Sequence, residues 1–299
     1  MRRFAPVAAI CVLLHALPAA AASLPEPLRQ MLDAALASNS EGDIVTVAKY
    51  VRLAAPDAAD EVDARVTAWR AARSAARKEQ LVEAGPLDLW KGRTDIGGFR
   101  NSGNSNAAGL SAGLDIRREG LDWRHRLRLR ADYQEDKGIK TREAYTASWE
   151  PSYKVNERLS VAGVAQYERD PFLGYDSRYS AALGIGYRAV STPALTIDVN
   201  AGPAFRFTSF IDGTREDSPA ARGSTSIALK LSRTLKLTND SAAYFDTTNN
   251  TVVSTSALDA KLIGPLSARL SYNLQYEGNP PAGRKTLDTQ TRASLVYDF

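Results

Sequence analysis

The sequence contains little sulfur and little imidazole. Among its 299 residues there is one cysteine, Cys11, and there are two histidines, His15 and His125. A disulfide needs two thiols and a cysteine-ligated metal site needs several, so this composition excludes both. Cys11 also lies in a segment that we expect to be removed, and it lacks the context of a lipoprotein processing site. We expect neither a metal nor another cofactor.

Long apolar runs are missing as well. After the first 22 residues, no stretch approaches the roughly 20 consecutive apolar residues that a membrane helix needs. A secretory signal precedes them, made of Arg2 and Arg3, an apolar run over 5–17 broken only by His15, and an Ala20-x-Ala22 site. This predicts a signal peptide over residues 1–22, with Ser23 as the first mature residue. An exported chain without a membrane helix is either soluble in the periplasm or a β-barrel.

Residues 23–86 have the periodicity of amphipathic helices. Apolar residues recur at i, i+3, i+4 and i+7 in three stretches: Leu28, Met31, Leu32, Ala35 and Leu36; Ile44, Val47, Ala48 and Val51; Val62, Val66, Trp69, Ala72 and Ala76. Pro56-Asp57 is a plausible helix start, and Gly85-Pro86 ends the pattern. We expect a short α-helical periplasmic segment, which is either a spacer or lid at a barrel mouth or a partner-binding module.

From residue 87 the apolar period changes from helical to alternating. The clearest case is Trp123–Tyr133, in which aromatic and aliphatic residues alternate with Arg124, Arg126, Arg128, Arg130 and Asp132. Side chains in a strand alternate between its two faces, so this stretch presents one apolar face and one charged face. Such a division is typical of a membrane strand, although a soluble sheet with one solvated face could also produce it.

Similar strands are expected throughout residues 87–299. Clear runs lie at 145–153, 159–167, 179–187, 195–207 and 266–276, with weaker runs near 90, 110, 227, 241 and 258. Together with Trp123–Tyr133 and the C-terminal strand they make about 12, an even number, as closed single-chain barrels require. The predicted fold is all-β: a closed antiparallel transmembrane β-barrel of about 12 strands, preceded by the helical segment.

The connections between these strands alternate in length. Short ones are expected at 119–120, 155–157, 191–193, 232–233 and 264–265; longer ones are expected around 101–104, 134–141, 170–176, 209–218, 247–250 and 278–285. Outer-membrane barrels have short periplasmic turns and longer external loops. The sequence thus predicts both termini on the periplasmic side.

The chain ends on an alternating strand whose last side chain is aromatic. Leu295, Tyr297 and Phe299 share one face of this tail. A terminal aromatic residue on such a strand resembles the sorting signal of outer-membrane proteins. Other rings gather at both ends of the predicted strands on the lipid-facing parity, as aromatic girdles require. The predicted location is the outer membrane of a Gram-negative bacterium.

One stretch is specific enough to suggest a family. Tyr167-Glu168-Arg169-Asp170-Pro171-Phe172-Leu173-Gly174-Tyr175-Asp176-Ser177-Arg178-Tyr179, followed by Gly184–Arg188, resembles the salt-induced outer-membrane protein family, whose domain has no assigned function. The resemblance covers Trp90–Phe299 and leaves out the helical segment. It implies an outer-membrane barrel linked to salt or envelope stress, and it supplies no catalytic motif.

The arginine column is the most pointed feature of the predicted lumen. Arg124, Arg126, Arg128 and Arg130 would attract anions and repel cations if they line an open path, which gives a narrow, anion-preferring pore. Alternatively they pair with acids of the same parity and fill a structural barrel, because small barrels are usually filled. The candidate acids are Asp115, Glu150, Glu168 and Asp198.

A barrel enzyme acting on lipid or peptide is the other reading. Hydrolysis usually needs a histidine or paired acids, and after signal removal only His125 is left, on the lipid-facing parity beside Trp123. We therefore expect no catalytic residue. The net charge of +4 is mild and indicates no nucleic-acid partner. The expected partners are outer-membrane lipid, lipopolysaccharide and the barrel assembly machinery, and the oligomeric state is open.

Overall fold

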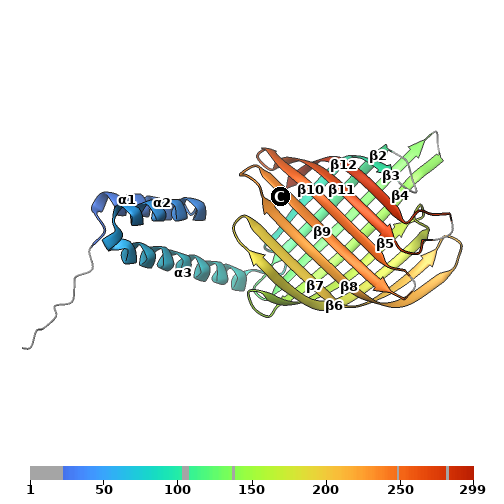
Figure 1. Ribbon diagram of the computed structural model, residues 1–299, viewed down its shortest axis with the longest axis horizontal. Coiled ribbons are helices and arrows are strands. Elements are labelled where there is room, and N and C mark those ends of the chain that lie inside the picture. The colour runs from blue at the N-terminus through green and yellow to red at the C-terminus, as the bar shows by residue number, and fades with distance from the viewer. Residues whose placement is uncertain (1–22, 103–107, 137–138, 248, 281–282) are drawn as a thin grey trace, which may run out of the picture. The chain divides into compact units, whose positions relative to one another are not determined.

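The computed structural model describes residues 23–102, 108–136, 139–247, 249–280 and 283–299. The predicted signal peptide, residues 1–22, lies outside them. The chain forms two compact units, one up to Gln80 and one from Leu81 to Phe299 (Figure 1). The predicted boundary between the helical segment and the barrel lies a few residues later, at 86/87.

The first unit is built from three helices. They are α1 (Glu26–Ala37), α2 (Glu41–Ala54) and α3 (Ala59–Glu83), with a single 3-10 turn, η1 (Pro56–Ala58), before α3. Ser40 caps α2 by accepting a hydrogen bond from the backbone N–H of Asp43, and Pro56 opens η1, where a missing N–H costs nothing. Within the described residues, no helix combines the length and apolarity required to cross a membrane.

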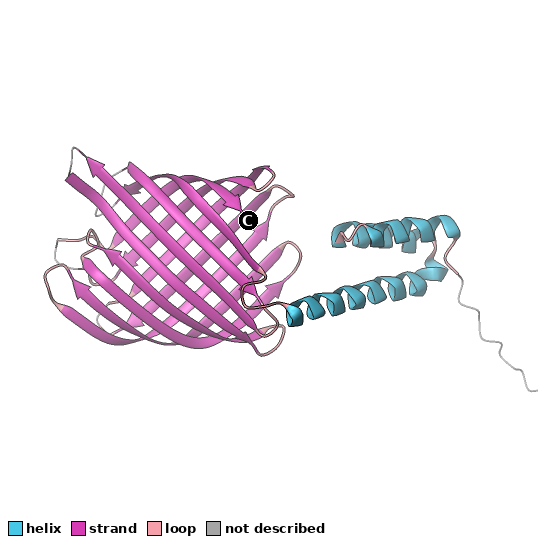
Figure 2. Cartoon of the chain, turned by 180° about the vertical axis from the view of Figure 1, so that it is seen from behind, coloured by secondary structure: helices cyan, strands magenta, loops and turns pink. Residues whose placement is uncertain are grey.

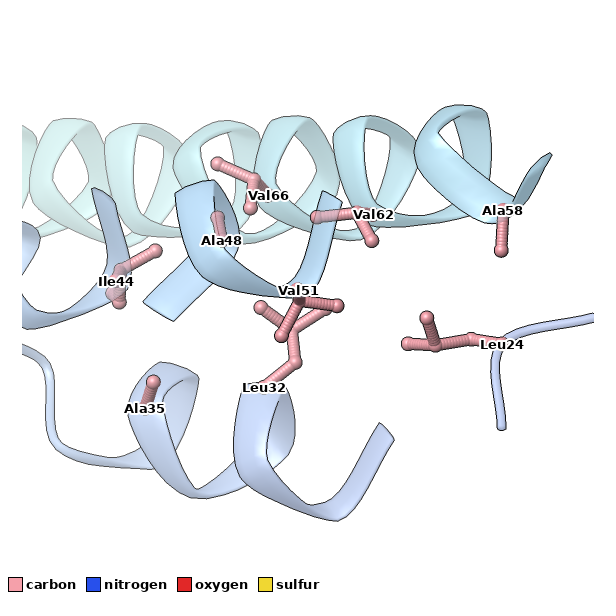
Figure 3. Packing of buried hydrophobic residues seen from close by; sticks show 9 residues of the cluster. All are labelled: Leu24, Leu32, Ala35, Ile44, Ala48, Val51, Ala58, Val62 and Val66. Atoms are coloured by element: carbon pink, nitrogen blue, oxygen red, sulfur yellow. The ribbon is translucent and has the colours of Figure 1, made fainter. Parts of the chain in front are cut away.

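The apolar faces of these helices meet in one small core (Figure 3). Its buried members are Leu24, Leu32, Ala35, Ile44, Ala48, Val51, Ala58, Val62 and Val66. The helical periodicity identified most of them, but Met31, Ala72 and Ala76 are exposed. For Ala72 and Ala76 the reason is length: α1 and α2 have 12 and 14 residues, so they cover only the first half of the 25-residue α3.

The second unit is a closed antiparallel barrel of 12 strands, as predicted. Each strand pairs with the next along the chain, and β1 pairs with β12 to close the sheet (Figure 2). The strands are β1 (Trp90–Ser102), β2 (Ala108–Glu119), β3 (Trp123–Asp136), β4 (Ile139–Lys154), β5 (Leu159–Asp170), β6 (Tyr175–Ser191), β7 (Leu195–Phe210), β8 (Arg215–Lys230), β9 (Leu235–Asp246), β10 (Thr251–Ile263), β11 (Leu266–Glu277) and β12 (Leu287–Asp298).

The barrel is apolar outside and polar inside. Along β3, Trp123, Leu127, Leu129 and Tyr133 are exposed on the outer surface, whereas the arginines between them line the interior. The outer surface also carries exposed rings near both ends of the strands, among them Tyr179, Phe207, Phe245 and Tyr276 at one end and Tyr153, Tyr187, Tyr297 and Phe299 at the other, whereas Tyr145 lies nearer the middle of β4.

Phe299 closes the barrel at the last residue. Its backbone exchanges two hydrogen bonds with Gly92, each 2.8 Å long. A Cβ atom at Gly92 would lie 2.2 Å from the ring of Phe299, so only glycine leaves room for the ring beside β1. The terminal aromatic residue is therefore part of the seam between the first and last strands.

The two ends of the barrel differ less than the sequence predicts. We call the end that holds Trp90 and Phe299 the terminal end and the opposite end the loop end. Polar stretches predicted as long loops at 134–141 and 209–218 are mostly strand, because β3 continues to Asp136, β4 begins at Ile139, and only 211–214 connect β7 to β8. The strands have 12 to 17 residues, more than the roughly 9–11 that span a bilayer. The polar residues therefore extend the sheet instead of forming loops.

Candidate functional site: the charged lumen

The interior of the barrel holds a cavity of about 620 Å³, lined by side chains from all 12 strands. The seven residues predicted to face the lumen all lie on its wall: Arg124, Arg126, Arg128, Arg130, Glu150, Glu168 and Asp198. The alternation of β3 explains the position of the arginines, because every second side chain of a strand points to the same face.

Each arginine of the β3 column has a carboxylate partner. Arg124 pairs with Glu119 at 3.0 Å, Arg130 with Asp95 at 3.3 Å, and Arg128 with Glu150. Arg126 is held twice, by Asp115 at 2.7 Å and by Asp240 at 3.3 Å. All four arginines are thus paired, and Arg126 also pairs with a carboxylate on a strand that is not adjacent to β3.

The pair of Arg126 and Asp240 crosses the lumen. Arg126 belongs to β3 and Asp240 to β9, which stand half a turn apart in the closed order of 12 strands. The same carboxylate lies 4.0 Å from Arg128 and accepts a hydrogen bond from Ser226 at 2.6 Å. This bridge places charged side chains across the interior of the barrel.

Two of the predicted acids behave differently. Asp198 pairs with Arg188, a neighbour on β6, at 2.8 Å, and none of the β3 arginines lies within ion-pair distance of Glu168 in the described structure. Sequence reasoning also missed Asp95, Glu119 and Asp240 as partners. All three have the inward parity, but only the closed barrel shows which strands face each other across it.

Buried ion pairs fill the loop end of the lumen. Arg178 on β6 pairs with Glu277 on β11 at 3.0 Å, and the two side chains are 4% and 5% exposed. Arg206 donates to Thr251 at 2.9 Å and pairs with Asp246 at 3.4 Å. The guanidinium of Arg178 stacks on Tyr175, whose hydroxyl accepts a hydrogen bond from Gln275. These contacts link β6 to β11 and β7 to β9 and β10 at this end of the lumen.

The turn between β5 and β6 makes further contacts at the loop end. Leu173 and Tyr175 are buried, and the carboxylate of Asp170 accepts hydrogen bonds from the backbone N–H groups of Phe172 and Leu173 at 3.1 Å. Arg284 donates to the backbone carbonyl of Phe172 at 2.6 Å. The turn is therefore tied to the barrel wall and to the connection between β11 and β12.

The terminal end is more open to water. The pair of Arg188 and Asp198 is 26% and 33% exposed, against 4% and 5% for Arg178 and Glu277. The pair at the loop end is thus far less exposed to water than the pair at the terminal end.

The imidazole ring of His125 lies on the outer surface of the barrel. Its ring stacks between Trp123 and Trp149 on the outer surface, with centroid distances of 5.9 and 6.1 Å. Among the residues that the structure describes, no group of three or more histidine, cysteine or acidic side chains is arranged to hold a metal ion.

An apolar outer surface around a charged interior, in a closed antiparallel sheet, is the architecture that transmembrane β-barrels share. Residues 94–299 match the family described as "Protein of unknown function, DUF481", and the chain belongs to this family. That description assigns no role, so the link to salt stays a prediction. No curated protein matches the chain.

Several solved structures are similar to this chain. The NanC porin has 11% sequence identity and a TM-score of 0.49, covering 69% of this chain and all of the porin. The translocator domain of the autotransporter NalP from Neisseria meningitidis has 9% identity and a TM-score of 0.44, covering 80% of this chain and 98% of that domain. The KdgM porin has 13% identity and a TM-score of 0.38, covering 69% and 99%.

Proposed function

We propose that this protein lies in the outer membrane of a Gram-negative bacterium and that its lumen is a narrow, anion-preferring passage. The apolar outer surface with exposed rings near both strand ends supports the location, because lipid requires such a band between two aromatic girdles. The helical segment and the terminal end then face the periplasm, where the signal peptide would deliver the chain.

The observation that carries the proposal is the surplus of positive charge on the lumen wall. The wall includes 17 arginine and lysine side chains against 10 aspartate and glutamate side chains. Some of these cations also pair with four carboxylates that are not part of the wall: Glu143, Asp246, Asp259 and Asp298. Even with these carboxylates included, the basic side chains outnumber the acidic ones. Fixed positive charge along a passage concentrates anions and repels cations.

The double variant Arg126→Ser, Arg128→Ser tests this function. We expect the reversal potential of the refolded protein in a planar bilayer, under a salt gradient, to move toward zero selectivity relative to the wild type. The variant also removes the bridge to Asp240, so its conductance should rise. An unchanged reversal potential in a correctly folded variant would exclude these arginines from the ion path.

We also propose a non-enzymatic role, which the surroundings of His125 support. His125 is held between two tryptophans on the outer surface, where it suits the membrane interface better than proton transfer. His125→Ala should therefore leave the function unchanged. Loss of lipid or peptide hydrolysis in this variant would favour the enzyme instead.

We extend the proposal to the partners and to stress. Leu295, Tyr297 and Phe299 would be read by the barrel assembly machinery, and the outer surface would contact lipid and lipopolysaccharide. Deleting Phe299 removes the two hydrogen bonds to Gly92 and should lower the amount of assembled barrel in outer-membrane fractions. The resemblance to salt-induced proteins predicts that a strain without this protein grows more slowly in high salt, and equal growth would remove that link.

A further inference from the structure

The wall of the lumen near the terminal end carries a lysine that no carboxylate neutralises. Lys236 on β9 lines the cavity, and its register partner on β10 is Asp259. Both oxygens of Asp259 are already taken: Arg93 donates at 3.1 Å, and Arg269 donates twice, at 2.5 and 2.8 Å. Within the described residues, no acidic group lies at ion-pair distance from the Lys236 ammonium.

A second carboxylate nearby is shared in the same way. Asp115 accepts from Arg117 at 2.9 and 3.0 Å and from Arg126 at 2.7 Å. Asp115 is also the register partner of Arg93, which links the two groups across β1 and β2. Two carboxylates are thus each held by two guanidinium groups, with Lys236 as an additional cation.

The four basic side chains lie on the cavity wall, whereas not every carboxylate that pairs with them does. Arg93, Arg117, Lys236 and Arg269 all line the cavity, whereas Asp259 does not and its side chain is only 7% exposed. Asp115 also lines the cavity, and Asp298 pairs with Arg93 at 2.9 Å, so the four cations of this region are matched by only three carboxylates, Asp115, Asp259 and Asp298.

We infer that Lys236, Arg93, Arg117 and Arg269 form a binding site for a small, multiply charged oxyanion, of which phosphate is the simplest. Guanidinium forks and an ammonium group provide the charge-assisted hydrogen bonds that the oxygens of such an anion accept. A divalent anion would offset the repulsion between the four cations, which a monovalent anion does less well. The inference rests on the proposed anion preference of the lumen, but it does not need the lumen to be open at both ends.

The test is a titration of the refolded full chain with inorganic phosphate, followed by calorimetry in a detergent without phosphate groups. We expect saturable binding that Lys236→Gln weakens by about ten- to a hundredfold, which is the loss of one or two charge-assisted hydrogen bonds. Lys236→Arg, which keeps the charge, should retain most of the binding. Lys230→Gln is the matched control, because Lys230 is the register partner of Lys236 on β8 but lies outside the cavity wall.

The outcomes separate this site from the proposed function. Absence of saturable binding in the wild type, or equal weakening by Lys236→Gln and Lys230→Gln, would overturn the site even if the barrel conducts anions. Saturable binding that depends on Lys236 would support the site even if bilayer recordings show a cation-selective pore, in which case the proposed function fails alone. Headgroup phosphate as the ligand is excluded by the choice of detergent.

Discussion

Ion pairs in this lumen differ in how far water reaches them. The pair of Arg178 and Glu277 is buried between opposite walls, and Thr251 and Asn249 also hold the carboxylate, at 2.9 and 2.6 Å. The pair of Arg188 and Asp198 stands at the wetter terminal end. A buried charge that loses its partner is costly, whereas a charge in contact with water is not.

The two pairs give a matched prediction on stability. Arg178→Met should lower the free energy of unfolding by about 3–5 kcal/mol, because it leaves Glu277 buried without a counter-charge. Arg188→Met should lower it by about 1 kcal/mol or less, since water can solvate Asp198. A urea titration of the refolded barrels measures both. Equal losses would mean that the loop end is as wet as the terminal end.

The direction of single side chains on a strand is testable in the same way. Leu127 faces outward on β3, and Ser160 lines the cavity from β5. An arginine at Leu127 should cost about 2–4 kcal/mol in lipid, and an arginine at Ser160 much less. Refolding titrations in lipid vesicles would measure the two changes, and a larger cost at Ser160 would show that the inward and outward faces are exchanged.

At the scale of elements, β6 and β7 leave no room for a side chain where two glycines face each other. Gly184 and Gly202 lie opposite one another, between the pairs Ala182–Ala204 and Ile185–Ala201. A Cβ atom at Gly202 would lie 2.2 Å from the backbone oxygen of Leu183, so any side chain there forces the strands apart.

This contact predicts a position-dependent effect of alanine. Gly202→Ala should lower the free energy of unfolding by about 1–3 kcal/mol, the usual cost of overpacking. Gly223→Ala on β8 is the control, because a Cβ atom there would meet nothing within 4 Å. The urea midpoints of the two variants measure this difference. If Gly202→Ala is as stable as Gly223→Ala, β6 and β7 do not lie so close together at Gly202 in the folded barrel.

The helical unit has its own pH dependence. Glu61 on α3 accepts a hydrogen bond from the backbone N–H of Leu24 at 2.7 Å, and with the nearby guanidinium groups of Arg29 and Arg65 this lowers the pKa of Glu61. A carboxyl group whose pKa is lower in the folded state adds stability above its unfolded pKa, and that stability is lost as the pH falls through the folded value.

We therefore expect the melting temperature of the helical circular dichroism signal at 222 nm to fall when the pH is lowered from about 6 to about 3. Glu61→Gln should start lower at the higher pH and change less on acidification, because the amide cannot titrate. A variant that loses as much stability as the wild type over this range would show that other carboxyl groups cause the dependence.

Local periodicity determined most of these elements. Alternation along β3 predicted both the strand and the inward side of Arg126, since a period of two residues leaves no other arrangement. Polar composition misplaced the loop at 134–141, because long strands carry polar residues beyond the lipid. Helical periodicity also placed Ala72 and Ala76 on a buried face, although both are exposed because no other helix of the described residues covers that part of α3.

The lumen was predictable only in part, for a geometric reason. Parity fixes which side chains point inward, but it does not fix which strands face each other. The bridge from Arg126 to Asp240 depends on the closed order of the strands and joins residues 114 positions apart. A single sequence contains no local signal for such a pair, whereas Asp115, on the strand next to Arg126, could be named as a partner.

At the scale of the whole molecule, the barrel combines a positive lumen with two groups of ion pairs. One is the bridge between Arg126 and Asp240, and the other is the buried network around Arg178 and Glu277. Under the proposed function, the surplus of arginine and lysine on the wall would make the passage prefer anions, and the two groups of ion pairs would limit its conductance. A small conductance with a preference for anions is therefore the expected combination.

The reversal potential of the wild-type barrel in a planar bilayer, with potassium chloride more concentrated on one side, measures that sign directly. We expect a small conductance and a potential displaced toward the equilibrium potential of chloride. A large, cation-selective conductance would contradict a positive lumen and would mean that acids such as Glu150 and Asp198 control the path.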